Sequence, residues 1–248
     1  IEPIAACRLA LVRPLTDDPD MRVRYQLAFS LGAAEGRARN RALADIALHD
    51  SADSWMALAI QSSLDRGAGD VLGLLARDPV YRATGHGSQL LVNLAGQIGK
   101  ANRSNEIARV ITTLGELGED DASLSKQLVE ALLVSQQGEA RDRILAAAGG
   151  KAAGILMQLL AEATAVASDD KQPAEKRSEA IRSLQLASLD EIKPLIARLL
   201  DFRQPGSVQA AALETLGDYS QPAAASLILD NWQGMSPSLR ATAAETLM

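Results

Sequence analysis

The sequence predicts an all-α fold, a right-handed α-solenoid of about seven helix pairs that is truncated at both ends. Three observations predict it: a recurring turn-and-helix segment, a repeat period slightly above 30 residues, and apolar residues at helical spacing. In the segments 17–32, 204–217 and 236–247, a polar residue and a proline precede an Ala-rich amphipathic helix. Because such a helix cannot bury its apolar face alone, it has to stack on a copy of itself.

The repeat period follows from prolines and leucines at matching positions. Pro173, Pro205 and Pro237 are 32 residues apart, as are Leu184 and Leu216. A period of this length fits two helices of roughly 12 residues joined by two short turns.

The first helix of each unit has a start signal. We expect the prolines at 19, 205 and 237 to occupy the first helical position, where no N–H group is needed. Asp18 and Ser236 would accept hydrogen bonds from the free N–H groups of the first turn, and residues 50–54 would cap the next helix. Glycines at 32, 99 and 217 are expected to end helices in the left-handed conformation.

Apolar residues recur with the period of an α-helix. In one unit they form a single stripe made of Val208, Ala211, Ala212, Thr215 and Leu216. No run alternates with the period of two that is typical of a half-buried strand. Small Ala and Gly residues on these faces would let stacked helices approach closely. The predicted second helices cover 43–48, 71–76, 107–117, 192–202 and 223–232.

The whole chain, residues 1–248, is predicted to be a single repeat domain, with regular repeats at 1–84 and 169–248 and an irregular middle at 85–168. In the middle, a helix at 141–148 is expected to precede a longer Ala-rich helix at 151–168. Further helices of the middle are predicted at 90–98, 107–117 and 124–134. Solenoids carry polar caps at both ends. Because neither end of this sequence supplies one, we expect a fragment of a longer protein.

Composition limits the function classes. Aromatic residues make up 3% and charged residues 23% of the chain, and the net charge is −6. A dedicated nucleic-acid binder would show a basic face, so no nucleic acid is expected as a partner. The single cysteine, Cys7, permits no disulfide and is expected to be a small core residue. No apolar run approaches about 18 residues, so no membrane span is expected. A local group of basic residues is interpreted as a solvated helix edge: Arg22, Arg24, Arg37, Arg39 and Arg41.

No arrangement of residues indicates catalysis. His49 should end a second helix, where a cation is favoured, and His86 should lie in a turn between two glycines. HExxH, GxGxxG, P-loop and GxSxG motifs are all missing from the sequence. The stretch 67–70 is interpreted as a turn, because no strand precedes it. The sequence therefore predicts no enzyme, no catalytic, cofactor-binding or metal-binding residue and no bound small molecule, and it leaves the binding residues open.

Acidic clusters and aromatic side chains admit both a structural and a functional interpretation. The acidic clusters at 17–20, 119–121 and 169–170 each precede a helix, so capping is favoured over calcium binding. The large aromatic residues could anchor a partner or fill gaps between repeats. They are Trp55, Trp232, Tyr25, Tyr81 and Tyr219.

The stretch that starts at Asp20 resembles the Asp-x-x-Val-Arg-x-x-Ala start of HEAT repeats, in particular the short PBS-lyase-type variety. In such repeats the Asp caps the helix and the Arg makes contacts between units, and Asp20 or Asp18 and Arg24 match here. Later units have Gln209 and Arg240 near the Arg position. The resemblance therefore implies contacts between units at Arg24, without implying a continuous Asp–Arg ladder.

Residues 23–32, 201–209 and 231–240 resemble the HEAT region of large secreted proteins of planctomycetes and their relatives. In those bacterial proteins a sugar-dehydrogenase-like β-propeller precedes the repeats, and a c-type cytochrome with a Cys-x-x-Cys-His haem site follows. Neither module lies in this chain. The resemblance implies a periplasmic or secreted oxidoreductase as the parent protein and no catalytic residue in the repeats themselves.

Together these observations predict a non-catalytic scaffold that docks neighbouring domains of the same chain or binds a protein partner. One alternative is a stand-alone protein-binding solenoid. Another is a HEAT-like enzyme, because PBS-type repeats resemble chromophore lyases and iron hydroxylases, although the paired His-Glu motifs of the hydroxylases are missing. A third is a DNA-binding module similar to alkylation-repair glycosylases. Candidate binding segments on the expected concave face are 37–49, 103–117, 139–148, 189–202 and 221–232.

Overall fold

The structure, a computed structural model, describes residues 14–134, 139–219 and 221–247, with only the backbone described at 139–149. Every regular element in these ranges is a helix, which confirms the predicted all-α class. The chain forms two compact units, 1–153 and 154–248. Cys7 lies outside the described residues.

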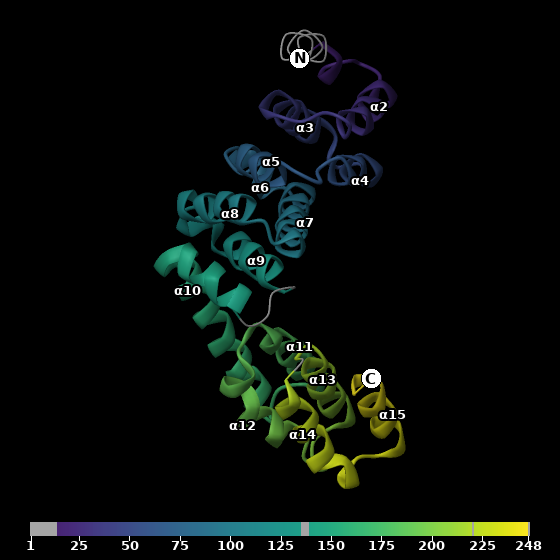
Figure 1. Cartoon of the computed structure of the whole chain (residues 1–248), viewed down its shortest axis with the longest axis vertical. Helices are drawn as coiled ribbons and strands as arrows, with labels where there is room; N and C mark the ends of the chain where they lie inside the picture. Colours follow the sequence, from purple (N-terminus) through teal and green to yellow (C-terminus); the bar gives the residue numbers. More distant parts are fainter. Residues whose placement is uncertain (1–13, 135–138, 220, 248) are drawn as a thin grey trace. The chain divides into compact units, whose positions relative to one another are not determined.

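The first unit consists of two sets of packed helices (Figure 1). One set contains α2 (Met21–Leu31), which packs on α4 (Ser54–Ser62), and α7 (Gly85–Ala101), which packs on α9 (Ala122–Leu133). In the other set, α5 (Ala68–Leu75) packs between α3 (Arg37–Asp50) and α8 (Ser104–Glu116). The short helix α6 (Pro79–Ala83) packs on α7, and the 3-10 turn η1 (Glu119–Asp121) precedes α9.

In the second unit, α11 (Ala174–Ser183), α13 (Gly206–Gly217) and α15 (Pro237–Thr246) pack in sequence. Their first residues lie 32 and 31 positions apart, as the proline spacing predicts. The helices α12 (Leu189–Leu199) and α14 (Pro222–Asn231) pack on α13. The 3-10 turns are η2 (Leu184–Leu186) and η3 (Trp232–Gly234).

The core of the second unit consists of large aliphatic side chains separated by alanines. Ile181, Ile196, Leu213 and Leu216 are buried there together with Ala211. Small residues between the larger ones let α11, α13 and α15 pack closely, as the sequence predicts.

The two helices predicted at 141–148 and 151–168 form one continuous helix. The structure has a single 30-residue helix, α10 (Glu139–Ser168), where the sequence predicted a break between 148 and 151. The pair Gly149-Gly150 lies at this position. An interior glycine costs a helix only about 1 kcal/mol relative to alanine, and the flanking Ala and Leu residues favour the helix.

Helix starts agree with the prediction at some positions and differ at others. Ser236 caps α15, because its Oγ accepts from the backbone N–H of Leu239 at 3.3 Å, and Asp53 caps α4 by accepting from that of Met56 at 2.9 Å. The predicted cap of α2 was wrong at Asp18, since Asp20 caps that helix instead.

The prolines do not all occupy the first helical position. Pro237 does, but Pro19 lies outside α2. Pro205 is the N-cap of α13, where its φ of −54° and ψ of 141° are extended. An extended N-cap satisfies the fixed φ of proline equally well, so the same residue marks the helix start one position earlier.

The three glycines expected to be left-handed are not. Gly32 follows α2 with a right-handed φ of −60°, and Gly99 and Gly217 lie within α7 and α13. Gly99 serves close packing, because an added Cβ would lie 2.3 Å from the carbonyl oxygen of Leu132. This glycine therefore lets α7 approach α9. The sequence did not indicate this packing role, because Gly99 stands where a helix was expected to end.

Within the described residues, none of the helices has the length and apolar character that crossing a bilayer requires.

Candidate functional site: a groove on α3, α5 and α8

A hollow of about 240 Å³ crosses the outer faces of α3, α5 and α8 in the first unit. We call it the α5 groove. Its lining residues are Arg37, Asn40 and Arg41 from α3, Gly69, Asp70, Gly73, Leu74 and Arg77 from α5 and its end, and Arg109, Thr112, Thr113 and Glu116 from α8. The groove thus joins parts of the predicted binding segments 37–49 and 103–117 with a helix that was not among them.

The hollow exists because α5 carries glycine where its neighbours carry long side chains. Gly69 is buried, and an added Cβ would lie 2.8 Å from the Cβ of Arg109. At Gly73 an added Cβ would lie 3.4 Å from Thr113 Oγ1, which is ordinary contact. The backbone of α5 therefore forms the floor of the groove, with room above Gly73.

A chain of polar contacts ties the three helices together at one end of the groove. Asn40 Nδ2 donates to Asp70 Oδ2 at 3.1 Å, and Arg109 Nε lies 3.0 Å from Asp70 Oδ1. Asn40 is only 4% exposed. Asp70 is thus held from α3 and in turn orients the guanidinium of Arg109.

The N-terminus of α5 is capped by a side chain from another helix. Glu106, in the first turn of α8, accepts from the backbone N–H of Gly67 at 2.7 Å and from that of Gly69 at 2.6 Å. Gly67 has a φ of 81°, a conformation that glycine adopts without strain. A carboxylate at this position satisfies free N–H groups and interacts favourably with the helix dipole.

The charges around the groove are mostly positive. Arg41 pairs with Asp45 at 3.0 Å, and Arg109 pairs with Asp70. Arg37 and Arg77 have no side-chain ion pair or hydrogen bond within the described part of the chain. Two of the lining cations are therefore available to a ligand.

One predicted edge residue is buried instead. Arg39, on α3, is 3% exposed, and its two terminal nitrogens donate to the carbonyl oxygens of Ser63 at 2.9 Å and Arg66 at 2.8 Å. Burial lowers the pKa of its guanidinium. The interpretation of Arg39 as a solvated side chain was wrong, because the open carbonyls after α4 need a donor.

Sequence reasoning missed Arg77, and it included Arg109 in the predicted binding segment 103–117 without singling it out. They are 32 residues apart, and only the packing of α5 on α8 brings both to one hollow. No local pattern marks either residue, although the glycines at 69 and 73 indicate a helix face with unusual space.

Two other hollows, of about 500 and 510 Å³, each contain an arginine that a carboxylate already pairs, and the first also contains Arg198, which has no side-chain ion pair or hydrogen bond in the described residues. In one, Arg177 pairs with Asp170 at 2.9 Å. In the other, Arg82 pairs with Asp121 at 2.8 Å. The α5 groove is the stronger candidate, because it presents two arginines that are unpaired in the described part of the chain, Arg37 and Arg77, among side chains from three packed helices.

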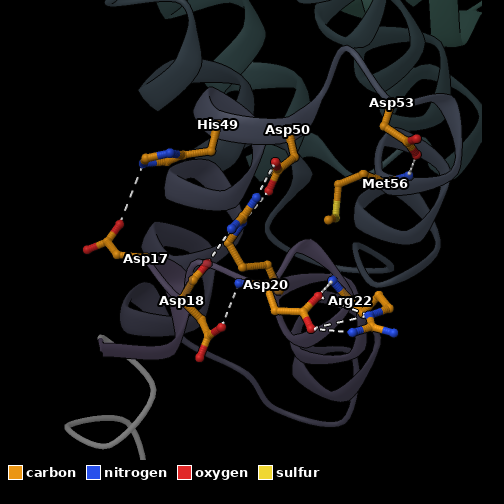
Figure 2. A network of polar contacts seen from close by, with 9 residues as sticks. Asp17, Asp18, Asp20, Arg22, His49, Asp50, Asp53 and Met56 are labelled. Carbon is orange, nitrogen blue, oxygen red and sulfur yellow. Dashed lines mark hydrogen bonds and ion pairs between the residues drawn. The ribbon is translucent and has the colours of Figure 1, made fainter.

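The acidic clusters have different roles. In the first cluster, drawn in Figure 2, Asp20 accepts from the backbone N–H of Arg22 at 2.9 Å and also pairs with its guanidinium. The hydrogen bonds with Arg22 lower the pKa of Asp20 to about 2. Asp18 accepts from the backbone N–H of Asp20, and Asp17 lies 3.5 Å from His49. Capping is confirmed here, at one residue of the cluster.

The other two clusters do not cap the following helices through their side chains, contrary to the prediction. Asp121 accepts two hydrogen bonds from Arg82, at 2.9 and 2.8 Å, and these lower its pKa. Asp170 pairs with Arg177, and Asp169 accepts from the backbone N–H of Lys171 at 3.0 Å. Arginine side chains bind one carboxylate of each cluster instead, Arg82 from 39 residues away and Arg177 from the helix that follows.

The two histidines are placed differently. His49 lies in the last turn of α3, as predicted. His86 lies in the first turn of α7 rather than in a turn between helices, with its ring edge-on to Tyr81 at 6.2 Å. In the described residues, no three His, Cys, Asp or Glu side chains come together in a way that could hold a metal ion.

Among the tyrosines and tryptophans of the described residues only Trp55 is exposed, while Phe29 and Phe202 are exposed phenylalanines. Tyr81 donates to Ser51 Oγ at 2.8 Å, and Tyr219 donates to the carbonyl oxygens of Leu184 and Ala187. Trp232 packs against the core of the second unit. Trp55 is 67% exposed and fills no gap between helices, contrary to one of the two interpretations.

Comparison with known proteins adds no assignment: no protein-family model, no curated protein and no solved structure matches this chain.

Proposed function

We propose that this chain is a non-catalytic interaction scaffold, a HEAT-like α-solenoid that docks a protein partner or a neighbouring module on the α5 groove. The observation that carries the proposal is the groove itself, which crosses three helices packed side by side and presents side chains from each of them. Solenoids bind partners along such faces because stacked repeats provide an extended surface.

The buried charged side chains support a structural rather than a chemical use. Arg39 donates to carbonyl groups after α4, Glu106 accepts from N–H groups at the start of α5, and Arg177 donates to the carbonyl oxygen of Ala167. Each satisfies backbone groups that a helix end leaves open. These side chains hold the helices in place and leave the groove surface for recognition.

A groove-dependent peptide selection tests the proposal. The full chain would be screened against a displayed library of peptides, with the variant Gly73→Met as the counter-selected protein. The methionine should fill the hollow, since the Cβ at this position meets only Thr113 Oγ1 at 3.4 Å. The matched control is Gly115→Met on α8, where an added Cβ has no neighbour within 4 Å and which does not line the groove.

We expect the selection to enrich peptides that bind the chain and the Gly115→Met variant but not Gly73→Met. If no peptide distinguishes the two variants while both unfold at the temperature of the parent protein, the groove is not a docking site.

We further propose, from the resemblance stated above, that the parent protein is a periplasmic or secreted oxidoreductase in which this solenoid lies between a propeller and a cytochrome. Reading the coding DNA on both sides of the segment tests this. A propeller upstream and a Cys-x-x-Cys-His motif downstream would support it, whereas further repeats with no catalytic module would refute it.

A further inference from the structure

We propose that the α5 groove binds an extended, carboxylate-bearing segment of a protein partner. This inference rests on the docking function proposed above and specifies the chemistry of the partner.

The free cations favour an anionic ligand. Four arginines line the groove against two carboxylates, on a chain whose net charge is −6. Arg37 and Arg77 have no partner among the described residues. A guanidinium binds a carboxylate through two parallel hydrogen bonds, and such charge-assisted bonds are stronger than neutral ones.

The orientation of a third cation is set before any ligand arrives. Arg109 is held by Asp70, which is itself held by Asn40 at 3.1 Å. Because the contacts come from α3 and α5, the packing of the helices fixes the guanidinium over the groove. Less conformational freedom is then lost on binding.

The lining also contains acceptors, which a peptide satisfies and a phosphate backbone does not. Thr112 Oγ1 and Thr113 Oγ1 donate to the carbonyl oxygens of Ala108 and Arg109, at 2.9 and 3.0 Å. Since each hydroxyl has one hydrogen, these threonines can only accept from a ligand. Glu116 is also an acceptor and needs a donor from the ligand. A peptide offers backbone N–H donors together with carboxylates, and so matches both parts of the lining.

The span of the groove suits a short segment. Packed helices lie 8–10 Å apart, so three of them extend over roughly 16–20 Å. At about 3.3 Å per residue, this corresponds to roughly five or six residues of extended chain.

The test is a direct titration of the full chain with fluorescent hexapeptides at low ionic strength, comparing hexaglutamate, hexaglutamine and hexalysine. We expect hexaglutamate to bind and its affinity to fall as salt is added. Arg37→Gln and Arg77→Gln should each weaken its binding at least about fivefold. The control Arg66→Gln, an exposed arginine that does not line the groove, should leave binding unchanged.

Two results would overturn the inference. One is equal affinity for hexaglutamate and hexaglutamine. The other is tighter, groove-dependent binding of a thymidine hexanucleotide, which would assign the groove to phosphates. The two proposals fail in different ways. If only the acidic preference is wrong, library peptides of neutral or basic composition are still selected on the groove. If the docking function is wrong, no library peptide distinguishes Gly73→Met from Gly115→Met.

Discussion

One helix of the first unit and three helices of the second place a hydrogen-bond donor at the same position, and the partners of these donors differ between the units. The fourth residue of α2 is Arg24, and in the second unit the fourth residues of α11, α13 and α15 are Arg177, Gln209 and Arg240. Arg24 donates to the backbone carbonyl of Asp18 and to both carboxylate oxygens of Asp50, at 2.6 and 2.7 Å.

In the second unit each of these donors also binds a backbone carbonyl, but its second acceptor differs from one helix to the next. Arg177 donates to Ala167 O at 3.1 Å and to the neutral side chain of Gln204 at 2.8 Å. Gln209 donates to Leu200 O, and Arg240 donates through Nε to Trp232 O at 3.1 Å.

The comparison shows which part of the arrangement recurs. Carbonyl groups at the end of a helix lack a partner within it, and at these four positions a donor from the following helix satisfies them. The ionic partner is an addition, present at Arg24 and Arg177 and replaced at Gln209 by a second carbonyl, that of Asp201. The helices can therefore stack even where the Asp–Arg pair is missing, as at Gln209.

The largest effect is expected for Arg177→Ala. Arg177 is 3% exposed, so its removal leaves the carbonyl of Ala167 unpaired and a void in the core. We expect the free energy of unfolding to fall by about 3 kcal/mol. Urea denaturation followed by the fluorescence of Trp232, in a Trp55→Phe background, measures this for the second unit.

The control for that variant lies on the same helix. Arg182 pairs with Glu214 at 2.9 Å with both side chains about half exposed, so Arg182→Ala should cost at most about 1 kcal/mol. Equal losses for the two arginines would mean that the backbone contact of Arg177 has no special weight.

A smaller loss is expected for Gln209→Leu. The side chain is buried, and the substitution keeps its approximate size while removing the donor to Leu200 O and Asp201 O. We expect a loss of about 1–2 kcal/mol in the same assay. An unchanged stability would show that these carbonyls need no donor and would break the parallel between the units.

The ionic contacts of the first unit should make it sensitive to acid. Hydrogen bonds from Arg82 lower the pKa of Asp121, so this pair stabilises the fold above the ordinary pKa of aspartate, about 3.9, and loses that contribution as pH falls through the lowered pKa. Asp121→Asn should therefore reduce the melting temperature at pH 7 and have a diminishing effect towards pH 2. A deficit that is constant with pH would contradict an ionic contribution.

The smallest effect is expected for Arg240→Ala. Its side chain is exposed, and the carbonyls of Trp232 and Gln233 that it contacts can turn to water. We expect a loss of at most about 0.5 kcal/mol in urea denaturation. A loss as large as that of Gln209→Leu would mean that the contact matters irrespective of burial.

Local sequence determined where most helices form and how some of them begin. The apolar stripe of α13 follows from residue spacing alone, and the caps Asp53 and Ser236 act on N–H groups three positions ahead. These features could be predicted because the interacting groups are neighbours in the chain, so the backbone geometry of a helix is enough to place them.

Only the tertiary structure decided the contacts between helices, and with them the candidate site. Glu106 caps α5 across 39 residues, Arg39 serves the end of α4 from α3, and Gly99 makes room for Leu132. The residues of the α5 groove come from three helices, and although Arg77 and Arg109 share the 32-residue spacing of the repeats, no period or motif connects either of them with Arg37. Which open backbone group a long side chain reaches depends on the rotation and spacing of packed helices, and the sequence specifies these only through the packing of the whole core.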